Sequence, residues 1–310
     1  MRFLPTAIVD AHHHLWRLDL GHYPWLQEAY QPATFILGDY APLCRDFTPA
    51  DYRAACGGAP VVATVHVEAE RARGEALAET LWLGVQHVEA GLPSVIVGWA
   101  DFASAEIDAQ LGAQARCPLL RGIRCKPRTA ARPGLSVRGE PGSMQDPQWL
   151  AGLAALEDYG LSWDLRVPFW HLEEAATVAA MFPGIPIVVE HAGLPWDRSA
   201  AGLAHWRRGM EALARSPQVH VKLSEFGLRD APWRAEDNAR IVRDCVAIFG
   251  WQRSMFGSNF PVAGLRIGYE PLVAAMADAL AELEDWQQQA IWHDNAARFY
   301  RIPSLAGRPA

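Results

Sequence analysis

The chain has 310 residues, of which 50% are hydrophobic and 20% are charged, with a formal net charge of -7 and a pI near 5.9. This composition is typical of a globular protein with a large core, and the acidic balance argues against general nucleic-acid binding. The five cysteines are scattered without a C-x-x-C pair, which favours a reducing compartment over a disulfide framework. Because no segment resembles a signal peptide or a membrane span, we expect a cytoplasmic protein.

Short apolar segments alternate along the chain with longer segments of helical period. Eight strands are predicted, at 8–14, 61–68, 95–102, 119–126, 161–167, 185–191, 219–224 and 254–259. Helical segments are predicted at 73–90, 104–115, 146–159, 172–182, 199–215, 236–249, 268–280 and 284–299. This alternation predicts an α/β fold, a (β/α)₈ barrel of the TIM type, whereas a doubly wound sheet is weakened because no G-x-G-x-x-G follows the first strand. We expect residues 1–310 to form one barrel domain, with a long aromatic loop at 17–48.

The first predicted strand ends in Asp10-Ala11-His12-His13-His14, the most informative motif of the chain. Because side chains alternate between the two faces of a strand, His12 and His14 share one face and His13 points the other way. Two imidazoles side by side suit a divalent cation, or a relay that polarises a carbonyl and moves protons. A tag remnant is the alternative, but a tag is normally a longer pure run outside the fold.

Polar side chains also close the other predicted strands. They are His66 and Glu68, Asp101, Arg124 and Lys126, Asp164 and Arg166, Glu190 and His191, Lys222 and Ser224, and Asn259. A single charge at a strand end is often only a solvated edge. In a (β/α)₈ barrel, however, the carboxyl ends of the strands meet at one mouth, where active sites form. The repetition of such residues therefore predicts an active site at that mouth.

Several short motifs follow one another in a recognisable order. They are residues 10–16, 23–26, 65–69, 97–101, 121–124, 191–195, 221–224 and 255–262. Together they resemble the amidohydrolase-related (amidohydrolase 2) family, in the branch with the sugar-acid lactonases and 2-pyrone-4,6-dicarboxylate lactonase. The resemblance implies an amidohydrolase-like barrel that opens a small lactone, or cleaves a related C–O or C–N bond, by water attack on the carbonyl.

One position departs from this family pattern. The resemblance implies an Asp at the end of the eighth strand as the acceptor of the water proton, but this chain has Asn259, whose neutral amide cannot act as a general base. Glu190 is the alternative base, although an ion pair within the barrel wall explains it equally well. The histidine expected at the fifth strand has no clear counterpart either. The candidate catalytic residues are Glu190, His191 and Asn259.

The same departure affects the predicted metal site. A catalytic zinc normally takes three protein ligands and keeps one open position, and His12, His14 and His191 could supply the three. Lys126 resembles the carbamylated lysine of binuclear relatives, but the other ligands of a second metal are missing. We expect one divalent ion, with zinc the first candidate, or none.

Basic and aromatic side chains indicate the character of the substrate. A guanidinium holds a carboxylate through two hydrogen bonds, although these cations could also simply balance acidic neighbours. The predicted substrate contacts are Trp25, His66, Arg124, Lys126, Arg166 and Trp170. We expect a small anionic or polyhydroxylated substrate, no nucleic-acid or membrane partner, and leave homo-oligomerisation open.

Three other functions stay open beside lactone hydrolysis. A zinc-dependent decarboxylase fits the broader family but would use the strand-eight Asp that this chain lacks. An amide or C–N hydrolase would use the same mouth. A non-catalytic barrel that only binds a ligand takes its main support from Asn259.

Overall fold

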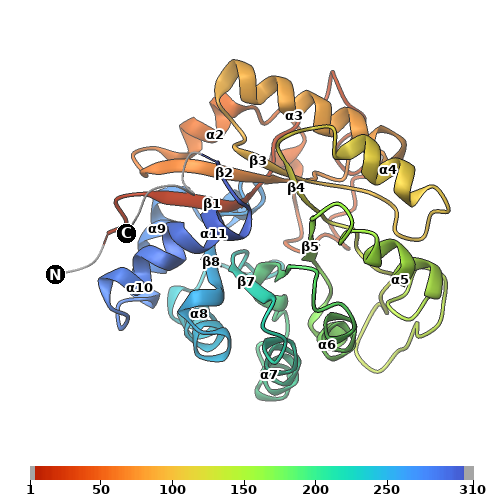
Figure 1. Cartoon of the computed structure of the whole chain (residues 1–310). Helices are drawn as coiled ribbons and strands as arrows, with labels where there is room; N and C mark the ends of the chain where they lie inside the picture. Colours follow the sequence, from red (N-terminus) through yellow and green to blue (C-terminus); the bar gives the residue numbers. More distant parts are fainter. Residues whose placement is uncertain (1–3, 304–310) are drawn as a thin grey trace.

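The computed structural model describes residues 4–303 and contains eight parallel strands arranged in a ring in chain order (Figure 1). They are β1 (Ile8–His13), β2 (Val61–Val67), β3 (Val95–Gly98), β4 (Leu120–Ile123), β5 (Ser162–Leu165), β6 (Ile187–Val189), β7 (Val219–Leu223) and β8 (Ser254–Phe256). The segment after β8 closes the ring, because the backbone N–H of Asn259 donates to the carbonyl of His12 at 2.7 Å and that of His14 donates to Phe260 at 2.8 Å. The predicted (β/α)₈ barrel is confirmed.

Helices follow the strands and surround the ring, as Figure 1 shows. Between β1 and β2 lie α1 (Pro24–Gln27) and α2 (Pro49–Cys56). The later helices are α3 (Ala76–Ala90), α4 (Ile107–Gln114), α5 (Pro147–Ala154), α6 (Leu172–Met181), α7 (Ala200–Ala214), α8 (Ala235–Phe249), α9 (Tyr269–Ala279), α10 (Asp285–Gln289) and α11 (Asn295–Phe299). A π-helical turn at Ala290–Asp294 separates the last two, so the final predicted helix is divided. Within residues 4–303, none of these helices is both long and apolar enough to cross a membrane.

The strands are apolar because both of their faces are buried. In β3, Val95 and Val97 belong to one buried cluster, whereas Ile96 between them belongs to a second cluster that includes residues of the helices. Tyr300, at the end of the chain's last helix, joins the first cluster. Each buried Val or Ile side chain contributes roughly 1.5–3 kcal/mol. The apolar side chains of the strands therefore stabilise the barrel, whereas the polar residues at the strand ends are available for function.

Candidate functional site

A cavity of about 600 Å³ lies at the carboxyl ends of the strands, within the usual size range of ligand sites. Polar side chains on it include His14, Arg124, Lys126, Arg166, His191 and Asn259. Aromatic side chains on it are Trp25, Phe35, Tyr40 and Trp196. The indole of Trp25 donates to the carbonyl of Ala69 at 2.9 Å and stacks on Phe35 with ring centroids 5.8 Å apart. The segment between β1 and β2 thus contributes a rigid aromatic part of the cavity.

Left-handed backbone conformations gather at the same end of the barrel. The non-glycine residues with positive φ include Glu70 after β2, His191, Ala192 and Leu194 after β6, Glu225 after β7 and Asn259 after β8. Such conformations cost on the order of 1–3 kcal/mol each and are typical of functional sites. The left-handed backbone positions therefore indicate the same end of the barrel as the functional region that the polar side chains indicate.

The histidine pair meets Asn259 at the bottom of this mouth. His12 Nε2 lies 3.3 Å from His14 Nε2, which lies 3.2 Å from Asn259 Oδ1. The Nδ1–H of His14 donates to the carbonyl of Val67 at 2.7 Å, which leaves Nε2 as an acceptor. Asn259 presents its oxygen because its amide nitrogen donates to Glu225 at 2.5 Å. Two acceptors therefore face each other with no proton between them.

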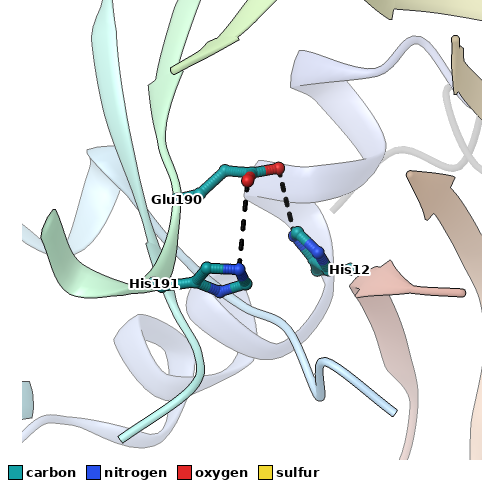
Figure 2. A group of neighbouring side chains, drawn as sticks. All are labelled: His12, Glu190 and His191. Carbon is teal, nitrogen blue, oxygen red and sulfur yellow. Dashed lines mark ion pairs between the residues drawn. The ribbon is translucent and has the colours of Figure 1, made fainter. Parts of the chain in front are cut away.

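This arrangement fits a divalent cation. Two ligands about 2.0–2.1 Å from a tetrahedral zinc lie about 3.3–3.4 Å apart, close to both distances above. Glu190 Oε1 and Lys222 Nζ each lie 3.3 Å from His12 Nδ1, so two charged groups lie beside this imidazole. Donor atoms of His12, Glu190 and His191 lie within 4.8 Å of one another (Figure 2). The structure thus places His12 close to both His14 and His191, the other two residues of the predicted set, and Asn259 lies beside His14 as a further donor.

Burial keeps the histidines of this site neutral. Desolvation lowers the pKa values of His12, His14 and His191 well below the ordinary value for histidine. The nearest cations act in the same direction, foremost Lys222 on His12 and Arg166 on His191. A neutral imidazole keeps the lone pair with which it binds a metal or accepts a proton.

The carboxylate of Glu190 points toward both His12 and His191 (Figure 2). Its side chain is buried, with Oε2 accepting a hydrogen bond from Arg124 at 3.2 Å and Oε1 lying 3.8 Å from Lys222 Nζ. It is absent from the described residues that line the cavity. A general base must reach the water directly or through one intervening water. The prediction of Glu190 as the direct base does not fit this position, which suits support of His12 and His191 better.

The three predicted substrate cations differ in their partners. Arg124 donates through Nε to Glu68 at 2.9 Å, and Lys126 forms an ion pair with Glu70. Burial, together with the charge of Arg166, lowers the pKa of Lys126 to about 8. Arg166 lines the cavity and makes no hydrogen bond or ion pair with any described residue. Arg166 is therefore the cation that is free to bind a ligand.

Two predicted substrate contacts lie outside this cavity. His66 is fully buried, accepts the backbone N–H of Leu15 at 3.1 Å and lies 3.7 Å from Glu79, so its predicted role does not fit its position. Trp170 donates to the carbonyl of Ala130 at 3.0 Å and lines a second cavity of about 680 Å³. The two cavities share Thr34, Ile36, Thr129, Pro168 and Trp196. Trp170 is therefore positioned only for a ligand that extends beyond the first cavity.

Asp164, Lys222 and Glu225 lie close to the site but were not among the predicted site residues. Lys222 Nζ lies 2.6 Å from Asp164 Oδ2 and 3.3 Å from His12 Nδ1, and these side chains are buried. The positions of Asp164 and Lys222 at strand ends are visible in the sequence. Glu225, the partner of Asn259, follows β7 by two residues, and no motif or spacing marks it.

Comparisons with known proteins identify the family of the chain. A family model described as Amidohydrolase matches residues 9–302. A Sinorhizobium fredii protein named "Uncharacterized protein y4mH" is 33% identical over 299 residues, covering 96% of this chain and 99% of that protein. An L-fucono-1,5-lactonase from Burkholderia multivorans is 29% identical over 96% of this chain and 97% of its own length. A crystal structure of a Burkholderia multivorans amidohydrolase with bound zinc is similar with a TM-score of 0.79 at 26% identity, covering 96% of this chain and 100% of that one.

Proposed function

Because the chain belongs to the amidohydrolase family, we propose that it is a hydrolase that opens a small lactone of a sugar acid or a dicarboxylate. The observation that carries the proposal is one cavity that combines the facing acceptors of His14 and Asn259 with the free guanidinium of Arg166. Similarity to a protein named L-fucono-1,5-lactonase supports an ester as the bond that is cleaved.

The substrate proposed for this cavity is anionic or polyhydroxylated. Arg166 offers a planar set of donors that suits a carboxylate or a pair of hydroxyls. Trp25, Phe35 and Tyr40 offer apolar faces for one side of a ring. Arg124 and Lys126 already have carboxylate partners, so their main role is to hold the charge balance around Arg166.

A divalent ion, with zinc as the first candidate, would be held by His12, His14 and the oxygen of Asn259. When bound, it would polarise the carbonyl and lower the pKa of a water molecule. Asn259 has no basic group, so its part is to accept or to ligate through Oδ1. This leaves His191 as a neutral imidazole that borders the cavity.

His191 is the group that we propose takes the proton of the attacking water. Ser224 Oγ lies 3.0 Å from its Nδ1 and can orient the ring. Glu190 Oε2 lies 3.9 Å from its Nε2, where a carboxylate stabilises the imidazolium that forms. As the C–O bond of the ring breaks, His191 returns the proton to the departing alkoxide, which leaves a hydroxy acid.

A screen of lactones tests this proposal. Purified protein, after zinc analysis, is assayed against neutral aldonolactones and lactones that carry a carboxylate, with acid release followed by a pH indicator. We expect turnover of at least one lactone and its loss in His191→Ala, while His205→Ala, a histidine of α7 outside the cavity, serves as the matched control. Zinc-loaded protein that opens no lactone of either class would contradict the proposal, and product binding without turnover would favour a ligand-binding barrel.

A further inference from the structure

A buried hydrogen bond joins two residues that are far apart in the sequence. Glu225 is 6% exposed and Asn259 is 2% exposed. The amide nitrogen of Asn259 donates to Glu225 Oε2 at 2.5 Å, and the backbone N–H of Gly227 donates to Oε1 at 3.2 Å. Both oxygens of this carboxylate are therefore occupied, and the cavity does not include Glu225 among its described lining residues.

The backbone at both ends of this hydrogen bond is left-handed. Glu225 has a φ of 46° and Asn259 a φ of 56°. Asn tolerates this region better than most residues, but Glu does so less readily. Asn259 is also anchored beside the histidine pair, because its N–H donates to the carbonyl of His12 at 2.7 Å. The fold thus accepts strain at two positions to bring these side chains together.

The orientation of the Asn259 amide is the unexpected part of this arrangement. Its oxygen lies 3.2 Å from His14 Nε2, which is itself an acceptor because His14 donates from Nδ1 to Val67. If the amide turned over, its NH₂ group could donate to His14, but its oxygen would then face the carboxylate of Glu225. The interaction with Glu225 therefore opposes the orientation that His14 alone would favour.

We propose that Glu225 is a positioning residue that holds the oxygen of Asn259 turned toward His14 and so keeps this oxygen available to a cation bound beside the histidine pair. Partners behind a ligand commonly change metal affinity by about 10- to 100-fold. The carboxyl group of Glu225 also lies next to the position where the family resemblance implies an aspartate. The proposal rests on the cation site of the proposed function, and it requires no lactone.

Zinc affinity gives the first test. Glu225→Ala removes the acceptor and frees the amide of Asn259, so we expect the zinc Kd, measured by chelator competition, to rise by about tenfold or more. Asp230→Asn, which removes an exposed charge from the same loop, should leave the Kd within about twofold. Equal Kd values for Glu225→Ala and wild type would overturn the proposal.

An exchange of the two groups gives the second test, read as thermal melting without metal. Asn259→Asp alone sets two buried carboxylates against each other across the 2.5 Å contact, so we expect a lower Tm. Adding Glu225→Gln restores a donor and an acceptor with their places reversed, so the double variant should melt above Asn259→Asp and bind zinc at least as tightly as wild type. The proposal would be overturned if the change in Tm of the double variant equalled the sum of the changes caused by Asn259→Asp and by Glu225→Gln separately. Neither readout involves lactone hydrolysis. A failure of the proposal for Glu225 can therefore be distinguished from a failure of the proposed function.

Discussion

Two polar layers of the barrel differ in how fully their atoms are paired. The buried layer comprises Asp10, Asp164 and Lys222. Among the described residues, these three do not line the cavity. The cavity layer comprises His14, Arg166 and Asn259, which line it. The first layer is saturated with partners, whereas the second keeps unpaired donors and acceptors.

The buried layer is saturated by short hydrogen bonds. Lys222 and Tyr300 donate to the same oxygen of Asp164 at 2.6 and 2.7 Å. Asp10 accepts from Tyr52 at 2.6 Å and from the backbone of Ser258 at 2.8 Å. Buried charges require such partners, whereas open groups at a ligand site find theirs when the ligand binds. The comparison teaches that changes in the buried layer should act on folding and changes in the cavity layer on chemistry.

The largest expected effect is that of Lys222→Met, in the buried layer. The change leaves the carboxylate of Asp164 without a cation, and breaking a buried pair in this way costs about 3–5 kcal/mol of unfolding free energy. Urea denaturation measures the loss. The double variant Lys222→Met/Asp164→Asn removes both charges and should recover most of it. A single variant as stable as wild type would break the distinction between the layers.

Next in size is the effect of His14→Ala, in the cavity layer. We expect lactone hydrolysis to fall by about 100-fold or more, because the proposed function places His14 among the residues that would hold the cation beside the carbonyl. The free energy of unfolding should fall by only about 1–3 kcal/mol, because the buried carbonyl of Val67 loses its hydrogen bond from His14.

His13→Ala is the matched control, since His13 faces away and packs on Tyr52 with ring centroids 4.5 Å apart. It should lower stability and leave turnover nearly unchanged. The reverse pattern in this pair would contradict the assignment of faces on β1.

A smaller effect is expected for Arg166→Ala. Hydrogen bonds to a charged group contribute about 1.5–3 kcal/mol, so KM for a lactone that carries a carboxylate should rise by about tenfold or more. KM for a neutral lactone should change much less. Arg128→Ala is the control, because Arg128 pairs with Glu140 and does not line the cavity. Equal losses for charged and neutral lactones would remove the argument for an anionic substrate.

The smallest expected effect is a pH dependence from Lys126. Its pKa is lowered to about 8, so the amine is a cation below that pH and becomes neutral above it. KM for an anionic lactone should therefore rise by about two- to threefold between pH 7 and 9. Lys126→Arg keeps the charge throughout this range and should flatten the profile. An unchanged profile in that variant would assign the titration to another group.

Local patterns account for the fold and for part of the site. All eight predicted strands are present because a buried parallel strand is a short run of β-branched and apolar residues, which sequence alone reveals. The strand period places His12 and His14 on one face, and their rings are 5.0 Å apart. The barrel closure then explains why His191, distant in the chain, lies with its ring centroid 4.5 Å from that of His12.

Which partner each charged side chain contacts is determined only by the tertiary structure. Arg124 and Arg166 look alike in the sequence, but Arg124 is held by Glu68 whereas Arg166 stays free. Glu225 carries no motif, and its contact with Asn259 depends on two left-handed residues on different loops. Periodicity indicates which face a side chain takes, but the partner of a charge depends on distances of a few ångströms between loops. Those distances exist only after the barrel has closed.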